Sequence, residues 1–442
     1  MTPIPTFQQI LQLCHSQQLP EAEAACKQLL TAEPDNARAL LLGGDIALGL
    51  GDKPTSQARL RRVASLADAK PEMQYHAAVL LARGEDIKGA AEVLRDISAR
   101  NPGVFPVLYD LAQMEESLHR RDAALQTYEA AIAANPGHAG PFTRRAVILL
   151  RQALGAPLAT PAEKAQPSSG RKYGRLTMSS LGSNGRFGNQ LLQYTVLRAL
   201  GAVHGLMVET PEWIGRWLFD LADPPTTADL PELREEDDNI ARLLLQRTRS
   251  KTAANQDLWG YCAYHSRYFK PHRDLMRKLF TPGARFRPRA DAAMAKLAAK
   301  GKTLVALHLR RGDFGRGPFW IAPESWYLDW LATLWPQLDQ PVLYIASDDP
   351  DIFRLFAAYS PVTAADFEPP IPGAEFYDDF HVLSQADHLG ISNSSFSFVA
   401  SLLNSRARSF MRPDLAMQQL VAYDPWNADV LLPHPDAATQ DT

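Results

Sequence analysis

Residues 303–313 read Thr-Leu-Val-Ala-Leu-His-Leu-Arg-Arg-Gly-Asp, an apolar run that ends in a cluster of charges. The apolar run predicts a buried strand over residues 303–307. In open α/β sheets, ligands bind beyond the carboxyl ends of the strands. The stretch therefore predicts an α/β domain with a binding site for an anion at the end of this strand.

His308, Arg310 and Arg311 supply the candidate anion-binding groups. A guanidinium presents a planar fork of N–H donors that matches pairs of phosphate oxygens. The alternative is a plain surface ion pair between Arg311 and Asp313, which would carry little energy. Two further segments, described below, favour the interpretation as a site.

The composition limits the possible classes of protein. At 442 residues the chain is expected to hold two or three domains, at about 150 residues each. A net charge of −3 gives no reason to expect binding to nucleic acid or to an acidic membrane. The cysteines Cys14, Cys26 and Cys262 lack metal-binding spacing, and so sparse a set is typical of a reducing compartment.

Targeting signals are not evident in the sequence. Residues 1–18 lack a basic start followed by an apolar core. The longest apolar stretches, such as residues 39–42, are too short to span a bilayer. We therefore expect no transmembrane segment, and a location in the cytoplasm or peripherally at a membrane.

Prolines recur in the first third of the chain at positions 34, 71, 102 and 136, with spacings of 37, 31 and 34 residues. Between them, large and small apolar residues alternate as two closely packed antiparallel helices require. This pattern resembles the tetratricopeptide repeat, whose period is about 34 residues. About four repeats are predicted over residues 4–152, forming an α-helical solenoid whose concave face binds a protein partner. A plain spacer or oligomerisation domain is the alternative.

Residues 153–172 contain three prolines and two glycines without an apolar period, which predicts a flexible linker. The linker should make the two parts of the chain separable. In residues 173–432, short aliphatic runs alternate with helical segments, a pattern typical of βαβ units.

A glycine loop opens this second domain, with Gly182, Gly185 and Gly188 spaced by three residues before a helical segment. Glycines allow a tight turn and a close approach of a ligand to the backbone. Asn189 is expected to begin the helix, and Gly185, Asn189 and Gln190 are candidate ligand-binding residues. The dinucleotide fingerprint does not fit this spacing. A simple strand-to-helix turn is the alternative.

Two later strand ends add polar groups to the expected site. A strand is predicted over residues 341–346, and Asp348 follows it. Another short strand precedes a helix that opens with hydroxyl-rich residues. A helix start of this kind offers backbone N–H groups and the positive end of the helix dipole to an anion. The candidates there are Asn393, Ser394, Ser395 and Ser397. Simple N-capping is the alternative.

Five segments together resemble glycosyltransferase family 11, the α-1,2-fucosyltransferases. They occur in the family's order across residues of about 174–430, which leaves the repeats outside the resemblance. The segments are Gly185–Tyr194, Gly260–Tyr261 with Ser266–Phe269, His308–Phe314, Ser347–Asp349 and Ser392–Ser397.

The resemblance implies a GT-B-like fold with two Rossmann-like halves, GDP-fucose as donor, inversion at the sugar carbon, and no metal or other cofactor. It implies that Arg310 meets the charge growing on the departing diphosphate, helped by Arg311 and the serines. It places His308 near the guanine or ribose and Asp348 in the donor pocket. Asp313 is a candidate catalytic base, and a structural partner of Arg311 is the alternative.

Other functions remain open at this point. Residues 381–387 also resemble the α-1,6-fucosyltransferases, and repeats before a catalytic domain also occur in protein O-glycosyltransferases. An inactive adaptor, in which the repeats bind the partner, is a third alternative. Phe314 stands where the family usually has tyrosine, and residues 398–401 replace a tryptophan-rich stretch. These departures concern the glycan acceptor and the linkage more than the donor.

Overall fold

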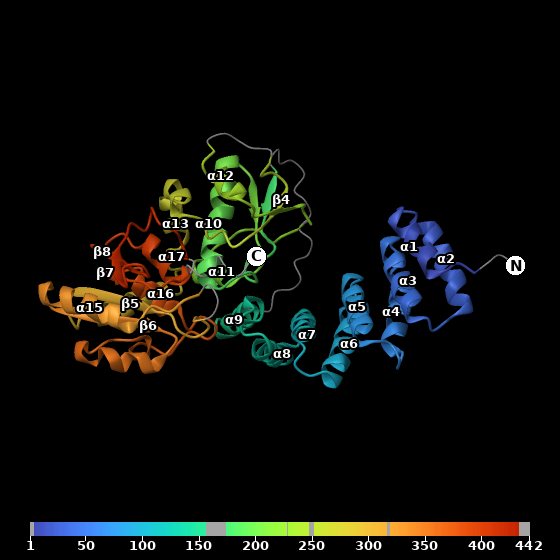
Figure 1. Cartoon of the computed structure of the whole chain (residues 1–442), viewed down its shortest axis with the longest axis horizontal. Coiled ribbons are helices and arrows are strands. Elements are labelled where there is room, and N and C mark those ends of the chain that lie inside the picture. The colour runs from blue at the N-terminus through green and yellow to red at the C-terminus, as the bar shows by residue number, and fades with distance from the viewer. Residues whose placement is uncertain (1–3, 156–173, 228, 247–251, 316–318, 433–442) are drawn as a thin grey trace. The chain divides into compact units, whose positions relative to one another are not determined.

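The computed structural model describes residues 4–155, 174–227, 229–246, 252–315 and 319–432 (Figure 1). The chain divides into two compact units, Met1–Pro136 and Gly137–Thr442. In the described part of the chain, no helix is both long and apolar enough to cross a membrane. Most of the predicted linker, 153–172, lies outside the described residues.

The first unit is an array of antiparallel helices that follow one another in pairs (Figure 1). Aspartates begin α4 and α6, where the Asp52 and Asp86 side chains accept backbone N–H groups of the first turn. The helices are α1 (Phe7–His15), α2 (Leu19–Ala32), α3 (Ala37–Gly49), α4 (Lys53–Ser65), α5 (Pro71–Arg83), α6 (Ile87–Arg100), α7 (Phe105–Ser117) and α8 (Arg121–Ala134).

The glycine pair in α3 does not interrupt the helix. A Cβ on Gly43 would lie 2.5 Å from the Cys26 sulfur, and one on Gly44 would lie 2.6 Å from a Leu60 methyl group. The two glycines therefore allow α2 and α4 to pack closely on α3, which offsets their low helix propensity. The predicted repeat architecture is confirmed in this unit.

Helix α9 (Ala139–Ala153) belongs to the second unit, although the sequence pattern assigns it to the repeats. Its Val147 and Leu150 are buried in the core that contains β1 and α10. Arg151 donates to the Glu212 carboxylate at 2.9 Å. The predicted array, residues 4–152, therefore runs one helix beyond the first compact unit.

The second unit contains two open sheets with helices between their strands (Figure 1). The first sheet has the order β2-β1-β4-β3, with parallel pairs. Its elements are β1 (Arg175–Thr177), α10 (Phe187–His204), β2 (Met207–Glu209), α11 (Ile214–Leu218), β3 (Glu232–Arg234), α12 (Asn239–Leu244), β4 (Gln256–Trp259) and α13 (Arg273–Leu279).

The second sheet has the order β6-β5-β7-β8-β9, and β9 runs antiparallel to β8. Every residue of β5 is buried, as its unbroken apolar run predicts. Its elements are α14 (Arg287–Ala298), β5 (Thr303–Leu309), α15 (Glu324–Leu334), β6 (Pro341–Ser347), α16 (Tyr377–Leu383), β7 (His388–Gly390), α17 (Ser395–Leu403), β8 (Ser409–Asp414) and β9 (Gln419–Ala422).

Helix α10 of the first half packs against α17 of the second half. The predicted fold class, a helical repeat array followed by two Rossmann-like halves, is confirmed. Helix α16 ends at Leu383, because the chain must turn before it enters β7 at His388.

Candidate functional site

The carboxyl ends of β5 and β6 lie side by side and carry a charged cluster. In this parallel pair Leu309 is opposite Ser347, so Arg310 and Asp348 leave the sheet at the same edge. The Arg310 guanidinium pairs with the Asp348 carboxylate at 2.7 Å and also with Asp313. The structure thus brings together the proposed catalytic arginine, the candidate base and a predicted donor-site residue.

Arg311 is buried, and its guanidinium is bonded to the loop around it. Its Nε and Nη2 donate to Glu324 at 3.1 and 2.8 Å. Nη1 donates to the backbone oxygen of Arg310 at 2.9 Å. The alternative of an Arg311–Asp313 pair is wrong, because Asp313 pairs with Arg310 instead. In this arrangement Arg311 holds the loop that presents Arg310.

His308 is buried within β5 and is a neutral imidazole. Burial, together with the nearby charges of Arg310 and Arg311, lowers the pKa of His308 to about 3. Its Nδ1 lies 2.7 Å from the Ser392 hydroxyl. A neutral imidazole can form hydrogen bonds with a ligand, but it adds no positive charge for a diphosphate.

The serine cluster lies at the start of α17, as the sequence predicts. Ser394 is the N-cap, and its hydroxyl accepts a backbone N–H two residues on at 3.4 Å. Ser397 is fully buried and donates to the Ser394 carbonyl. The Asn393 side chain exchanges hydrogen bonds with the Leu432 backbone, at 2.8 and 2.7 Å. Asn393 and Ser397 therefore have structural partners, and Ser394 and Ser395 remain at the helix start.

The starts of α10 and α17 touch each other at Gly188. A Cβ on Gly188 would lie 2.5 Å from the Phe396 backbone nitrogen, a distance that real Cβ atoms do not adopt. Helix α10 begins at Phe187 with Arg186 as N-cap, two residues before the predicted start at Asn189. Two helix N-termini, one from each half, thus converge beside the charged cluster.

Side-chain amides lie under the glycine loop. Gly185 has a φ of +82°, which favours glycine, and Gln190 donates to its carbonyl at 3.1 Å. The side-chain oxygens of Asn189, Gln190 and Gln193 are buried and accept no hydrogen bond from the described residues. Buried acceptors usually have partners, so these three oxygens are exceptions in the packing under the loop.

Arg186 is a site residue that the sequence argument did not select. Its guanidinium lies 3.3 Å from the Asp313 carboxylate, so Asp313 stands between Arg186 of the first half and Arg310 of the second. A charged residue directly before the helix, inside a glycine loop, was the available signal. Among the described residues, no three His, Cys, Asp or Glu side chains gather as a metal site.

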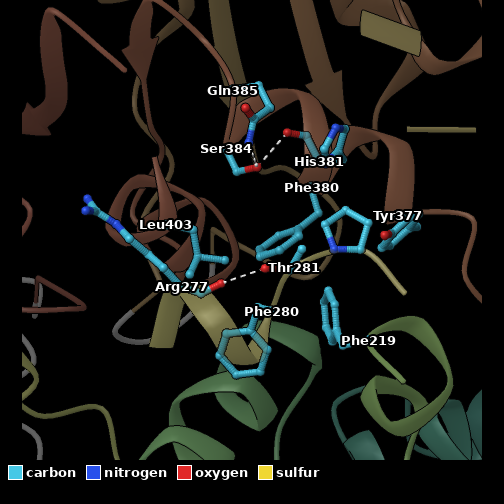
Figure 2. A pocket seen from close by; sticks show the side chains of 11 residues that line it. Phe219, Arg277, Phe280, Thr281, Tyr377, Phe380, His381, Ser384, Gln385 and Leu403 are labelled. Atoms are coloured by element: carbon cyan, nitrogen blue, oxygen red, sulfur yellow. Dashed lines mark hydrogen bonds between the residues drawn. The ribbon is translucent and has the colours of Figure 1, made fainter. Parts of the chain in front are cut away.

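A cavity of about 170 Å³ lies elsewhere in the second unit (Figure 2). Phe380 lines it and also packs on Phe187 and Phe396, with ring centroids 5.1 and 5.4 Å apart. An aromatic layer thus lies between this cavity and the two helix starts. The other lining residues are Phe219, Arg277, Phe280, Thr281, Pro282, Tyr377, His381, Ser384, Gln385 and Leu403. None of the predicted site residues lines this cavity.

A groove of about 670 Å³ runs along the first unit, over α1, α3 and α5. Its walls are largely apolar, and Val79 is 42% exposed. Two cations flank the apolar surface: Lys70, and Arg38, whose guanidinium lies 4.5 Å from the Phe7 ring centroid. The remaining lining residues are Leu41, Leu42, Asp45, Met73, His76 and Leu80.

No protein-family model matches the sequence. The chain is 27% identical over 184 residues to galactoside α-(1,2)-fucosyltransferase 1 of Oryctolagus cuniculus, which covers 38% of this chain and 47% of that protein. It is 26% identical over 249 residues to the Pan troglodytes protein of the same name, covering 50% and 63%. The chain thus spans about half to three-fifths of the length of these relatives.

Solved structures resemble each part of the chain separately. The MamA protein is 21% identical over 33% of this chain and 79% of its own, with a TM-score of 0.29. The α-1,6-fucosyltransferase NodZ, soaked with GDP-fucose, is 14% identical over 57% and 97%, with a TM-score of 0.38. Both scores lie below 0.5, so neither likeness supports a conclusion about this chain.

The described residues thus form a helical repeat array, followed along the chain by an α/β unit with a charged strand edge. The chain is similar in sequence to two galactoside α-(1,2)-fucosyltransferases, and the predicted resemblance is confirmed at this level.

Proposed function

We propose that the second unit transfers fucose from GDP-fucose to a glycan acceptor. The observation that carries the proposal is the meeting of two helix N-termini with Arg310 at the carboxyl edge of β5. Diphosphates bind at such edges and at such helix starts. The sequence similarity to fucosyltransferases selects fucose among the possible sugars.

The donor diphosphate would replace Asp313 as the anion that faces Arg310 and Arg186. Both guanidiniums pair with this carboxylate, which is 37% exposed. Asp348 and Arg311 would stay in place, since their bonds hold the loop. The N-terminus of α17, with Ser394 and Ser395, would take further phosphate oxygens.

The reaction would proceed with inversion at the anomeric carbon. The bond from fucose C1 to the phosphate oxygen breaks, and GDP leaves with the electron pair. The acceptor oxygen bonds to C1 from the opposite face, and its proton passes to a carboxylate. Asp313, once displaced from its arginines, is our candidate for that base. Arg310 stabilises the charge that develops on the leaving diphosphate.

The proposed mechanism needs no metal ion, because guanidiniums and a helix dipole meet the diphosphate. We further propose an α-1,2 linkage, because both sequence relatives carry that linkage in their names. The α-1,6 linkage and a protein acceptor remain outcomes of the test, as does an inactive adaptor. A cytoplasmic location, or a peripheral one at a membrane, is proposed on the sequence argument alone.

A donor and acceptor screen tests the proposal. The full chain is incubated with GDP-fucose in EDTA, with a galactoside, a GlcNAc-terminated glycan or a candidate protein as acceptor. We expect GDP release that depends on the galactoside and survives EDTA. Equal turnover of GDP-mannose would refute the donor, and restoration of lost activity by Mg²⁺ would refute the metal-free mechanism. Absence of turnover with every acceptor would favour the adaptor.

We propose that the groove of the first unit binds an extended polypeptide segment of the acceptor or of its carrier. Its apolar floor, between Arg38 and Lys70, suits apolar side chains flanked by carboxylates. Exchanging both cations for glutamate (Arg38→Glu with Lys70→Glu) should weaken transfer to the native acceptor. Transfer to a small sugar should continue unchanged. If this variant transferred fucose to the native acceptor as fast as the wild-type protein does, the proposal would be contradicted.

A further inference from the structure

Helix α9 packs against both halves of the second unit. Toward the first half, Arg151 bonds Glu212 at 2.9 Å, and its guanidinium lies 5.8 Å from the Trp217 ring centroid. Toward the second half, a Cβ on Gly373 would lie 2.2 Å from the Ala146 carbonyl oxygen. Helix α9, which the sequence pattern assigns to the repeats, therefore contacts residues of both halves of the second unit.

Phe142, near the start of α9, lies beneath Arg186. The Arg186 guanidinium carbon is 4.6 Å from the centroid of the Phe142 ring. The edge of the same guanidinium faces the Asp313 carboxylate at 3.3 Å. The aromatic face and the carboxylate thus define the plane and the position of a side chain that is 41% exposed.

An exposed arginine has many rotamers, and fixing one of them costs conformational entropy. A cation above an aromatic ring gains electrostatic and dispersion energy, which is larger where water is partly excluded. Burial is the main influence that lowers the pKa of Arg186, while the charge of Asp313 raises it. Phe142 supplies a platform that would remain when a ligand replaces Asp313.

We propose that Phe142 is a positioning residue for the donor: α9 holds Arg186 where its guanidinium takes the diphosphate once Asp313 moves away. This inference rests on the proposed transfer from GDP-fucose. It makes α9 part of the donor site through Phe142, which lies 44 positions before Arg186 in the sequence. It also predicts that Phe142 acts only through Arg186.

The test measures GDP affinity by calorimetry and GDP-fucose kinetics for variants of the full chain. Phe142→Leu keeps an apolar side chain but removes the aromatic face. We expect the Kd of GDP and the KM of GDP-fucose to rise about three- to tenfold, with a smaller change in kcat. Phe142→Tyr keeps the ring and should restore values near wild type.

Two controls separate positioning from a general loss of packing. Val147→Ala removes buried volume from α9 away from Arg186, and should lower Tm while leaving the KM of GDP-fucose unchanged. In a double-mutant cycle, Phe142→Leu should add little to the loss caused by Arg186→Gln, because both changes remove one interaction. Arg186→Lys serves if the glutamine variant does not fold.

The outcomes are distinct. An unchanged KM and Kd in Phe142→Leu, or losses that add fully to those of Arg186→Gln, would overturn the positioning role while transfer itself stands. The same loss in Phe142→Tyr as in Phe142→Leu would overturn it as well. If the wild-type protein neither binds GDP nor releases it from GDP-fucose, the proposed function fails, and the inference fails with it.

Discussion

Two adjacent arginines differ in what they contact, although their side chains are the same. Arg310 pairs with two partly exposed carboxylates, since its partners Asp313 and Asp348 are 37% and 27% exposed. Arg311 is buried, and its donors are used by Glu324 and by backbone oxygens. Arg310 is therefore the candidate for contact with a ligand, whereas Arg311 stabilises the loop.

Arg310→Ala should abolish transfer and leave the fold intact. By analogy with the loss of an oxyanion-hole donor, kcat should fall about 10²- to 10³-fold. Arg310→Lys should restore little, because the paired geometry of the guanidinium is lost. Steady-state kinetics with thermal melting measures both quantities, and near-normal turnover in a folded Arg310→Ala protein would exclude the donor assignment.

Arg311→Ala should act on stability instead. Removing the Arg311 guanidinium leaves Glu324 and the carbonyl oxygens of Arg310 and Ala322 without this donor, at a cost of about 1–3 kcal/mol. Denaturant unfolding should show this loss, whereas Arg310→Ala should unfold at nearly the wild-type midpoint. Equal destabilisation by both variants would contradict the division of tasks.

At the scale of elements, the first turns of α10 and α17 create the site. Gly188 allows the two helix starts to touch, and Phe187 seals the junction among Phe376, Phe380 and Phe396. Neither helix alone would offer two positive helix ends to one ligand. Helix α16 is linked to strand β6 by a partly buried hydrogen bond from the Tyr344 hydroxyl to Asp379.

Gly188→Ala should separate α10 from α17, because its Cβ would meet backbone atoms that cannot rotate away. We expect a lower Tm and a loss of GDP-fucose turnover larger than the loss of stability explains. Gly49→Ala, in α3, is the matched control: its Cβ would contact only a Leu19 methyl group at 3.3 Å. That change should be neutral or slightly stabilising, since alanine favours helices. An active Gly188→Ala protein would show that the helix contact is not needed.

Asp379 should make stability depend on pH near neutrality. Burial raises the pKa of Asp379 to about 7, while the Tyr344 hydroxyl opposes and Asp378 adds to the rise. The folded chain thus holds a proton that the unfolded chain releases near pH 4, so stability falls as pH rises from about 4 through 7. Melting curves of Asp379→Asn should lack this component and exceed wild type most at pH 8. The same change at the exposed Asp329 should leave the pH dependence unaltered; an identical result for both variants would contradict the assignment.

At the scale of the whole molecule, the chain divides into two compact units, and α9 belongs to the second of them. The repeat array, Met1–Pro136, has its own cores, one of them around Leu60, Val63 and Leu81. The second unit keeps α9 in its main core through Val147 and Leu150. Separation of the parts is therefore expected between residues 136 and 137.

A chain that starts at Gly137 should fold, bind GDP and transfer fucose to a small acceptor. A chain that starts at Lys172 lacks α9, which exposes the surfaces that Val147 and Leu150 cover, and should melt at a lower temperature and bind GDP more weakly. Melting curves and GDP titrations of both proteins decide the point. Equal behaviour would mean that α9 is dispensable and that the proline-rich stretch is the functional boundary.

The sequence by itself determined the helix pairs, the buried strands and the polar residues that follow each strand. The proline spacing predicts helix pairs, and the apolar runs at 303–307 and 341–346 predict buried strands, because burial on both faces selects such runs. Each strand is followed by polar residues, which locates the candidate site on the sheet edge. These are local patterns, legible within a few residues of one another.

Only the tertiary structure decided which of those polar groups hold the loop and which pair with partly exposed carboxylates at the strand edge. Arg310 and Arg311 are equivalent in sequence, and the position of Glu324 on α15 separates them. Arg186, Asp313 and Phe142 meet across 171 residues, and no local pattern encodes that contact. The boundary before α9 has the same cause: its helical period suits a repeat, but long-range packing of Val147 and Leu150 assigns it to the second unit.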